Sequence, residues 1–382
     1  MNIRNHFTAL LLLNLVTMGA TAQTERPESI KSIVQNEKDS AWYASQLELW
    51  KAETQKRPGD ETVWRNYYQA WRYLNRNNPT EGQAILDAMK QAIPDSYTYY
   101  RTAYYHEQGS DESFHMAEEA LKRLPREHND YDLWTGYLWM TAQWDRLAQM
   151  SKDYYDKGLY SPAVLQYNYN ELQGMDQDGI IVANGDAALI PKLLLQHGKG
   201  LHRDKVIIPF PFLYLPGYRE ALFKQLGIGD VPEPKEPTVD QEAFDKYVLQ
   251  LLETIRQRSH RPFYFSTTID VKELLSDWAD SLYNEGLTLK YSPVIYDNRA
   301  VKRRNVEKRY LLEYLRESFV PDSWTSGSRL SCNYAVLLAD LLPYYKKHNR
   351  ERYDWLLGTL TQGVVNTSLP MEEKTRFLDL LK

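Results

Sequence analysis

Apolar side chains in the first half of the chain recur at helical spacing, in segments punctuated by prolines. The separations of these prolines are 36, 31 and 37 residues, at Pro58, Pro94, Pro125 and Pro162. An aromatic residue follows each of the first two prolines by six positions, at Trp64 and Tyr100. A period of this length is typical of repeated helical hairpins. The pattern therefore predicts a helical repeat domain over residues 23–174.

The repeats resemble the tetratricopeptide family at several positions. An aromatic begins the first helix of a unit, small residues such as Ala103 stand where helices cross, and a proline closes the unit. Stacked hairpins of this kind leave a concave surface that binds peptides or proteins. Tyr68, Tyr104 and Tyr105 are candidates for that groove, with packing between helices as the alternative for each. Tyr68 and Tyr104 stand where the family prefers glycine.

The periodicity changes near residue 178, where short apolar runs begin to alternate with helical segments. The runs predict strands over residues 179–183, 205–209, 263–268 and 287–291. The segments between and after them predict helices over residues 187–196, 218–226, 241–259 and 271–284. Strands that alternate with helices favour a small, mostly parallel sheet. We therefore expect an α/β domain over residues 175–300, with a Pro-rich linker at 229–238, and a helical region over 301–382.

The predicted fold class is thus a helical-hairpin array followed by an α/β domain with a C-terminal helical cap.

The carboxyl ends of the predicted strands carry polar residues: Asn184, Gly185, Asp186, Thr267 and Thr268. Ligands of open parallel sheets bind outside this edge, so these residues form a candidate ligand site. Glycine lets the backbone approach a ligand, and the carboxylate and hydroxyls bind polar groups. Alternatively, Asn-Gly-Asp is an ordinary turn in which Asp186 caps the following helix.

Residues 178–382 also resemble the soluble region of bacterial membrane proteins related to protein O-mannosyltransferases. The motifs that carry the resemblance are Ile180 to Asp186, Leu201 to Ile208, Arg261 to Phe265 and Glu285 to Leu287. The sequence departs from that family at Ala187-Ala188 and at 209–213. Because glycosyl transfer in that family belongs to the membrane portion, the resemblance implies a fold and no activity. It also implies three terminal helices, over residues 334–348, 352–361 and 371–381, which are expected to pack as a helical cap.

The N-terminus has the features of a cleavable signal peptide over residues 1–22. Arg4 precedes an apolar stretch, and Ala20-Thr21-Ala22 supplies a small-residue cleavage site. The alternative is an N-terminal core helix. The signal peptide predicts export to the periplasm, with the extracellular medium as the alternative location. No later stretch is apolar enough for a transmembrane helix, so we expect no membrane segment in the mature protein.

Net charge, cysteine content and the absence of common motifs exclude several classes of function. The net charge of −5 gives no electrostatic footprint for nucleic acid. Cys332 is the single cysteine, which excludes an intramolecular disulfide, and its helical surroundings favour a buried thiol. The usual nucleophile, phosphate-loop, metal and dinucleotide motifs are missing. We therefore assign no catalytic residue, no metal and no cofactor.

Two functional hypotheses remain. The first is an exported, non-catalytic scaffold of the cell envelope that binds a protein or peptide partner in the helical-repeat groove. The 29 tyrosines and 10 tryptophans favour it, because aromatic side chains supply contact area at low entropic cost. The alternative is a carbohydrate- or nucleotide-sugar-handling accessory or enzyme with its site at the strand ends.

Overall fold

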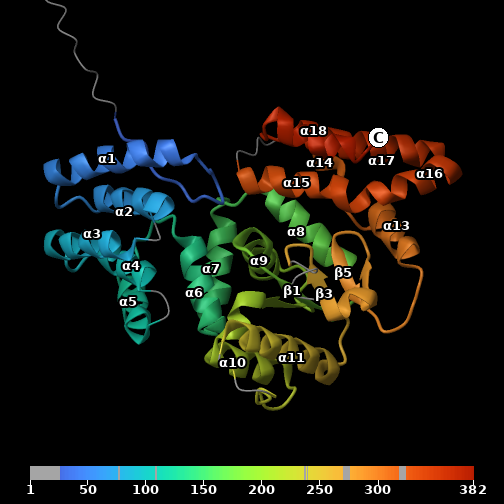
Figure 1. Cartoon of the computed structure of the whole chain (residues 1–382), viewed down its shortest axis with the longest axis horizontal. Coiled ribbons are helices and arrows are strands. Elements are labelled where there is room, and N and C mark those ends of the chain that lie inside the picture. Colours follow the sequence, from blue (N-terminus) through green and yellow to red (C-terminus); the bar gives the residue numbers. More distant parts are fainter. Residues whose placement is uncertain are drawn as a thin grey trace, which may run out of the picture. The chain divides into compact units, whose positions relative to one another are not determined.

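The computed structural model describes residues 26–75, 78–107, 110–235, 238, 240–269, 276–317 and 324–382 (Figure 1). The predicted signal peptide, 1–22, lies outside these residues. The contacts divide the chain into two compact units. Helices α1 to α4 belong to the first unit, and residues 31–38, helices α5 to α18 and the sheet belong to the second.

The first unit is built from paired helices. Its four helices are α1 (Ser40–Lys56), α2 (Glu61–Asn75), α3 (Pro79–Ala92) and α4 (Tyr97–His106). Helix α1 packs along α2, and α4 packs against both α2 and α3. The side chains of Asp39 and Ser96 cap α1 and α4 by accepting backbone N–H bonds. Buried aromatic side chains fill the space between the helices, among them Trp64, Tyr68, Trp71 and Tyr104.

Four further helices lead into the sheet. They are α5 (Asp111–Lys122), α6 (Tyr131–Met140), α7 (Trp144–Asp156) and α8 (Pro162–Gly174). Helices α6 and α7 pack as a hairpin. Helix α8 starts where the sequence indicates, because Ser161 accepts the N–H of Val164 and Pro162 occupies the first turn. The helical first half of the predicted fold is therefore confirmed.

The sheet has five strands in the order β2-β1-β3-β5-β4. The strands are β1 (Ile180–Ala183), β2 (Val206–Pro209), β3 (Phe263–Ser266), β4 (Leu282–Asn284) and β5 (Thr288–Tyr291). Strand β1 runs parallel to both β2 and β3, with Ile180 opposite Val206 on one side and Phe263 on the other. Strand β5 is antiparallel to β3 and β4. Every residue of β1 and β3 is buried, as continuous apolar runs in parallel strands require.

Helices cover both faces of the sheet (Figure 1). Helix α9 (Asp186–Leu193) follows β1 and continues into a π-helical turn at Leu194–Gly198. It packs against α6, α7 and α8 on one face. Helices α10 (Pro216–Leu226) and α11 (Gln241–Ser259) lie on the other. The predicted mostly parallel α/β architecture is present.

The chain ends in a group of helices. These are α13 (Asn298–Lys308), α14 (Glu313–Arg316), α15 (Thr325–Leu338), α16 (Leu342–His348), α17 (Arg350–Val365) and α18 (Met371–Asp379). Helix α15 is central, because it packs against α8, α17 and α18. Cys332 lies on α15, fully buried. Burial raises the pKa of its thiol to about 11.

Residues 31–38 connect to α15 although they lie between two parts of the first unit in sequence. The N–H of Thr325 donates to the carbonyl of Gln35 at 3.3 Å, and the hydroxyl of Ser326 donates to the carbonyl of Val34 at 3.0 Å. Arg329 forms an ion pair with Glu37 at 3.0 Å. The segment is thus part of the second unit.

Two helix predictions are wrong in part. The helix expected over residues 271–284 is a 3₁₀ turn at Ser276–Ser281 and strand β4 at Leu282–Asn284, while 271–275 lie outside the described residues. The helix expected over residues 334–348 breaks at Ala339–Leu341. The break is explained by Pro343, which has no N–H for the preceding helix and occupies the first turn of α16.

Among the helices of the described residues, none combines the length and the apolar character needed to cross a bilayer.

Candidate functional site

The parallel strands create a topological switch point. Strand β1 is followed by α9 and then by β2, which lies on one side of β1. The chain then crosses back, and β3 lies on the other side of β1. Because the two connections leave in opposite directions, a crevice is expected outside the carboxyl ends of β1 and β3. The residues that follow these ends are Asn184, Gly185, Asp186, Thr267 and Thr268. The structure thus places all five predicted ligand-site residues at one edge of the sheet.

Hydrogen bonds fix the backbone at this edge. The N–H of Asn184 donates to the hydroxyl oxygen of Thr268 at 3.2 Å, which joins the ends of β1 and β3. The hydroxyl of Thr268 donates in turn to Ser266 at 3.1 Å. Thr267 lies 3.3 Å from the hydroxyl of Tyr167 on α8. We refer to the five predicted residues together with Asp132, described below, as the switch-point site.

Asp186 does not cap its own helix. Helix α9 begins at Asp186, and the cap position is taken by Gly185, which has a φ of 88° that L side chains rarely adopt. No atom lies within 4 Å of the position that a Cβ would occupy at Gly185. Asn184, Gly185 and Asp186 are all exposed. The helix-cap role considered for Asp186 is therefore wrong.

Asp132 is a further member of the site that sequence analysis missed. It lies in the first turn of α6, a helix that packs against α9. Burial, followed by the negative charge of Asp186, raises the pKa of Asp132 to about 7. The carboxyl group of Asp132 is therefore partly protonated near neutral pH. The one indication in the sequence was that Asp132 stands between Tyr131 and Leu133, two residues that are buried in the structure.

Aromatic side chains provide the low-dielectric surroundings of Asp132. The hydroxyl of Tyr154 on α7 donates to Asp132 Oδ1 at 3.0 Å. The ring of Tyr160 packs edge-on against Tyr154, with the centroids 5.3 Å apart, and lies 4.7 Å from the ring of Trp324. The Tyr160 hydroxyl also lies 3.4 Å from the carbonyl oxygen of Asp186. Burial and the charge of Asp132 raise the pKa of both tyrosines, so both remain neutral hydrogen-bond donors.

A buried ion pair holds α9 in place beneath the site. Lys192 of α9 and Glu171 of α8 approach to 2.6 Å, and both side chains are fully buried. Lys192 Nζ also donates to Asn168 Oδ1 at 2.6 Å, and Asn168 Nδ2 donates to the carbonyl of Ala187 at 2.8 Å. Burial lowers the pKa of Lys192. The network fixes the first turn of α9, and with it Asp186, relative to α8.

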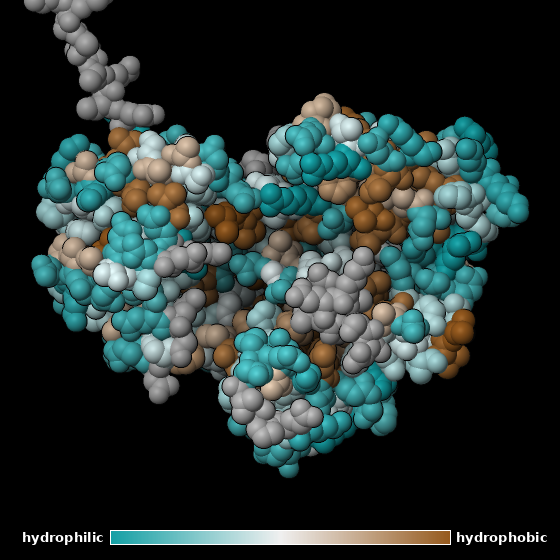
Figure 2. Space-filling model, viewed as in Figure 1, coloured by the Kyte–Doolittle hydropathy of each residue, from teal (hydrophilic) through white to brown (hydrophobic). Residues whose placement is uncertain are grey.

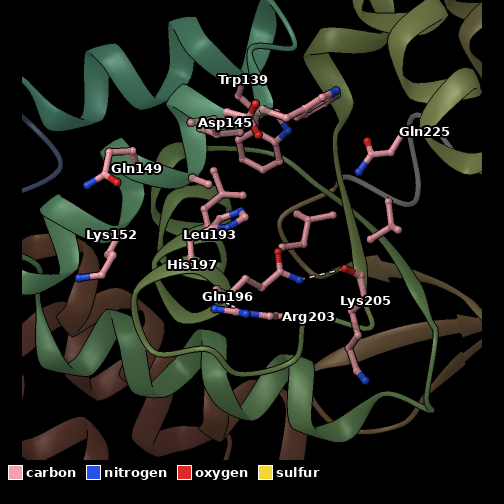
Figure 3. A pocket seen from close by; sticks show the side chains of 15 residues that line it. Trp139, Asp145, Gln149, Lys152, Leu193, Gln196, His197, Arg203, Lys205 and Gln225 are labelled. Carbon is pink, nitrogen blue, oxygen red and sulfur yellow. Dashed lines mark hydrogen bonds between the residues drawn. The ribbon is translucent and has the colours of Figure 1, made fainter.

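A hollow of about 630 Å³ lies beside the edge strand β2, away from the switch-point site (Figure 3). Helix α7 contributes Asp145, Gln149 and Lys152, and the π-helical turn contributes Gln196 and His197. Figure 3 shows Gln225 across from them and the basic side chains of Arg203 and Lys205 below.

The polar groups of this hollow are largely engaged with the protein itself. Gln196 Nε2 donates to the carbonyl of Lys205 at 2.9 Å, Arg203 Nε donates to the carbonyl of Gln196 at 2.9 Å, and Lys205 pairs with Asp204 at 2.7 Å. Burial, then the charge of Arg203, lowers the pKa of His197. None of the predicted site residues lines the hollow. Within the described ranges, no group of three or more potential metal ligands is present.

The three tyrosines proposed for a partner groove lie in the first unit. Tyr68 and Tyr104 are 1% and 4% exposed. They therefore belong to the core between helices, which was the alternative to a groove position. Tyr105 is half-buried, and the guanidinium carbons of Arg72 and Arg101 lie 4.1 and 5.0 Å from its ring centroid. Only Tyr105 keeps surface that a partner can reach.

Comparisons of the chain with models of protein families, with curated proteins and with solved structures found no match. The structure itself defines a class of architecture, which is a helical N-terminal region of paired helices followed by a mixed α/β region with C-terminal helices.

Proposed function

We propose that this protein binds a small hydroxyl-rich ligand, a carbohydrate or the sugar of a nucleotide sugar, at the switch-point site. The observation that carries the proposal is the group of polar residues at the carboxyl ends of β1 and β3, joined by the bond from Asn184 to Thr268, with Asp132 of α6 beside Asp186. An ionised carboxylate accepts hydrogen bonds from sugar hydroxyls, and a protonated one also donates. Gly185 leaves room for a ligand against the backbone.

The same pair supports acid–base chemistry on the bound ligand. The carboxyl group of Asp132, with a pKa near 7, is suited to exchange protons with a ligand at neutral pH. The resemblance of residues 178–382 to the soluble region of proteins related to O-mannosyltransferases implies a fold and identifies no ligand. It supplies no catalytic residue.

The test is calorimetric binding of a panel of monosaccharides, disaccharides and nucleotide sugars to the wild-type chain and to Asp186→Asn. We expect at least one ligand to bind the wild type and to lose tenfold or more in affinity in the variant, as for a lost hydrogen bond to a charged group. Asp230→Asn, an exposed aspartate after α10, is the matched control. Equal affinities for the two variants would contradict the proposal, as would a panel without any binder.

A second candidate function is a protein-binding scaffold of the cell envelope, with tetratricopeptide-like hairpins as the contact surface. The observation that favours it is the stacking of Arg72 on Tyr105, both partly exposed, because Tyr and Arg dominate binding energy in protein interfaces. Arg101, on the same ring, is buried and supports Tyr105 from the core. A photo-crosslinking amino acid at position 105, compared with one at the exposed Lys51 of α1, tests it in the cells that produce the protein. The scaffold is supported by a partner captured only from position 105, and the same products from both positions count against it.

A further inference from the structure

The loop between β5 and α13 exposes two adjacent aliphatic side chains. Val294 is 67% exposed and Ile295 is 88% exposed, which is the largest value among the exposed large hydrophobic residues described. Figure 2 shows an apolar patch on the protruding edge where Figure 1 draws this loop. Folding thus leaves in water two side chains whose burial elsewhere would be favourable.

Hydrogen bonds hold the loop in this conformation. The N–H of Val294 donates to the hydroxyl oxygen of Ser292 at 3.2 Å, and that hydroxyl donates to the carbonyl of Val294 at 2.7 Å. On the other side of Ile295, the hydroxyl of Tyr296 donates to Glu285 at 2.7 Å. The two aliphatic side chains are therefore presented by a fixed turn, with anchors on both sides.

A strongly basic surface adjoins the loop. Residues 298–309 and 342–353, which cover α13, α16 and the start of α17, contain ten Lys and Arg and two Glu, in a chain whose net charge is −5. Helices α13 and α16 are neighbours, since Arg303 bonds Tyr344 and Glu307 accepts the hydroxyl of Tyr345 at 2.6 Å. Figure 1 draws the loop, α13 and α16 along the same side of the second unit.

Most of these cations face the solvent. Lys302 is the exception, because it is buried and forms an ion pair with Asp340 at 2.6 Å. The exposed ones include Arg299, Arg304, Lys308, Lys346 and Lys347. An apolar tip beside several exposed cations matches the two components of an anionic bilayer, the acyl boundary and the negatively charged headgroups.

We propose that this surface docks the protein on a membrane that contains anionic phospholipids, with Val294 and Ile295 inserted below the headgroups. Neither component suffices alone, because stable membrane association takes two signals, such as an apolar insertion and a polybasic patch. The aliphatic tip favours lipid over a soluble polyanion, which has no apolar phase to receive it. The inference is independent of the ligand proposed for the switch-point site.

Flotation with vesicles tests the proposal on the chain produced without residues 1–22. We expect it to float with vesicles of equimolar phosphatidylcholine and phosphatidylglycerol, and to stay at the bottom with phosphatidylcholine alone or at high salt. Replacing both Val294 and Ile295 by Ser should lower the partition coefficient about tenfold. Arg304→Glu should lower it by a similar factor, roughly tenfold.

Matched controls separate docking from general effects of charge and apolarity. Met371→Ser removes another exposed apolar side chain, 71% exposed, and Lys224→Glu reverses an exposed charge on α10. Both should float as the wild type does. The proposal is overturned if the wild type ignores anionic vesicles, if the loop variant floats normally, or if dextran sulfate in solution binds the loop variant and the wild type equally while vesicles bind neither.

Discussion

At the scale of single residues, the strand-end rule found five members of the switch-point site but not Asp132. The rule works because β1 and β3 are parallel and adjacent, so the residues that follow them meet at one edge. Asp132 comes from α6, a different part of the chain, and only the packing of α6 against α9 brings its charge close to Asp186. The periodicity of one segment does not predict which helices pack together, so it could not place Asp132 near Asp186.

The raised pKa of Asp132 predicts a specific dependence of stability on pH. The folded state holds the proton up to about pH 7, whereas the unfolded chain releases it near 4, so stability falls as pH rises between these values and levels off above the folded pKa. Asp132→Asn removes this loss while keeping an oxygen for Tyr154. Relative to the wild type, the variant should gain on the order of 2 kcal/mol between pH 5 and pH 8.

Urea unfolding at the two pH values measures this gain. Asp186→Asn serves as the companion variant, because loss of its charge should lower the pKa of Asp132 and flatten part of the same slope. Parallel pH profiles for the wild type and Asp132→Asn would show that Asp132 titrates normally.

At the scale of elements, local pattern located most strands and helices but failed where a neighbour decides the structure. Residues 282–284 continue a helical pattern, yet they pair with β5 as strand β4, and Tyr283 packs on Tyr296 with ring centroids 4.7 Å apart. The pairing and the ring contact outweigh the weak local preference. The strands β1 and β3, buried along their whole length and apolar except at Ser266, were predictable because burial on both faces leaves few alternatives.

Close packing of α3 on α2 gives Gly82 a role that helix propensity would not suggest. A Cβ at this position would lie 2.2 Å from Trp71 Cη2 and 2.6 Å from His106 Cε1. Gly82→Ala should therefore destabilise the protein by about 1–3 kcal/mol, against the usual gain from replacing glycine inside a helix.

Gly136 provides the matched control on α6, because no atom lies within 4 Å of its added Cβ. Gly136→Ala should be neutral or stabilise by up to about 1 kcal/mol. Chemical denaturation of both variants gives the comparison. If Gly82→Ala is as stable as Gly136→Ala, the contact between α2 and α3 is looser than described.

At the scale of the whole molecule, the sequence indicated helices first and an α/β region second, which the structure confirms. The predicted boundaries at residues 174 and 300 stay predictions. The division by contacts groups α5 to α8 with the sheet, because α6, α7 and α8 all pack on α9. Helical periodicity alone does not reveal which hairpins pack on a sheet that follows them in sequence.

Two compact units predict more than one unfolding transition. Differential scanning calorimetry of the whole chain should resolve two components, and Gly82→Ala, which lies in the first unit, should lower the midpoint of only one. For a unit of this size a loss of 1 kcal/mol shifts the midpoint by roughly 4–8 °C. A single transition that moves as a whole would mean that the units unfold together.

The docking of residues 31–38 on α15 constrains how the protein is made. Val34 and its partner Ser326 are 292 positions apart. At about 5–20 residues per second, the ribosome needs on the order of 15–60 s to deliver the second partner after the first. The intervening α1 to α4 emerge complete in that interval. Helices α1 to α4 can therefore finish folding early, while residues 31–38 stay unpaired with α15 until the C-terminal helices appear, and their docking completes the second unit last.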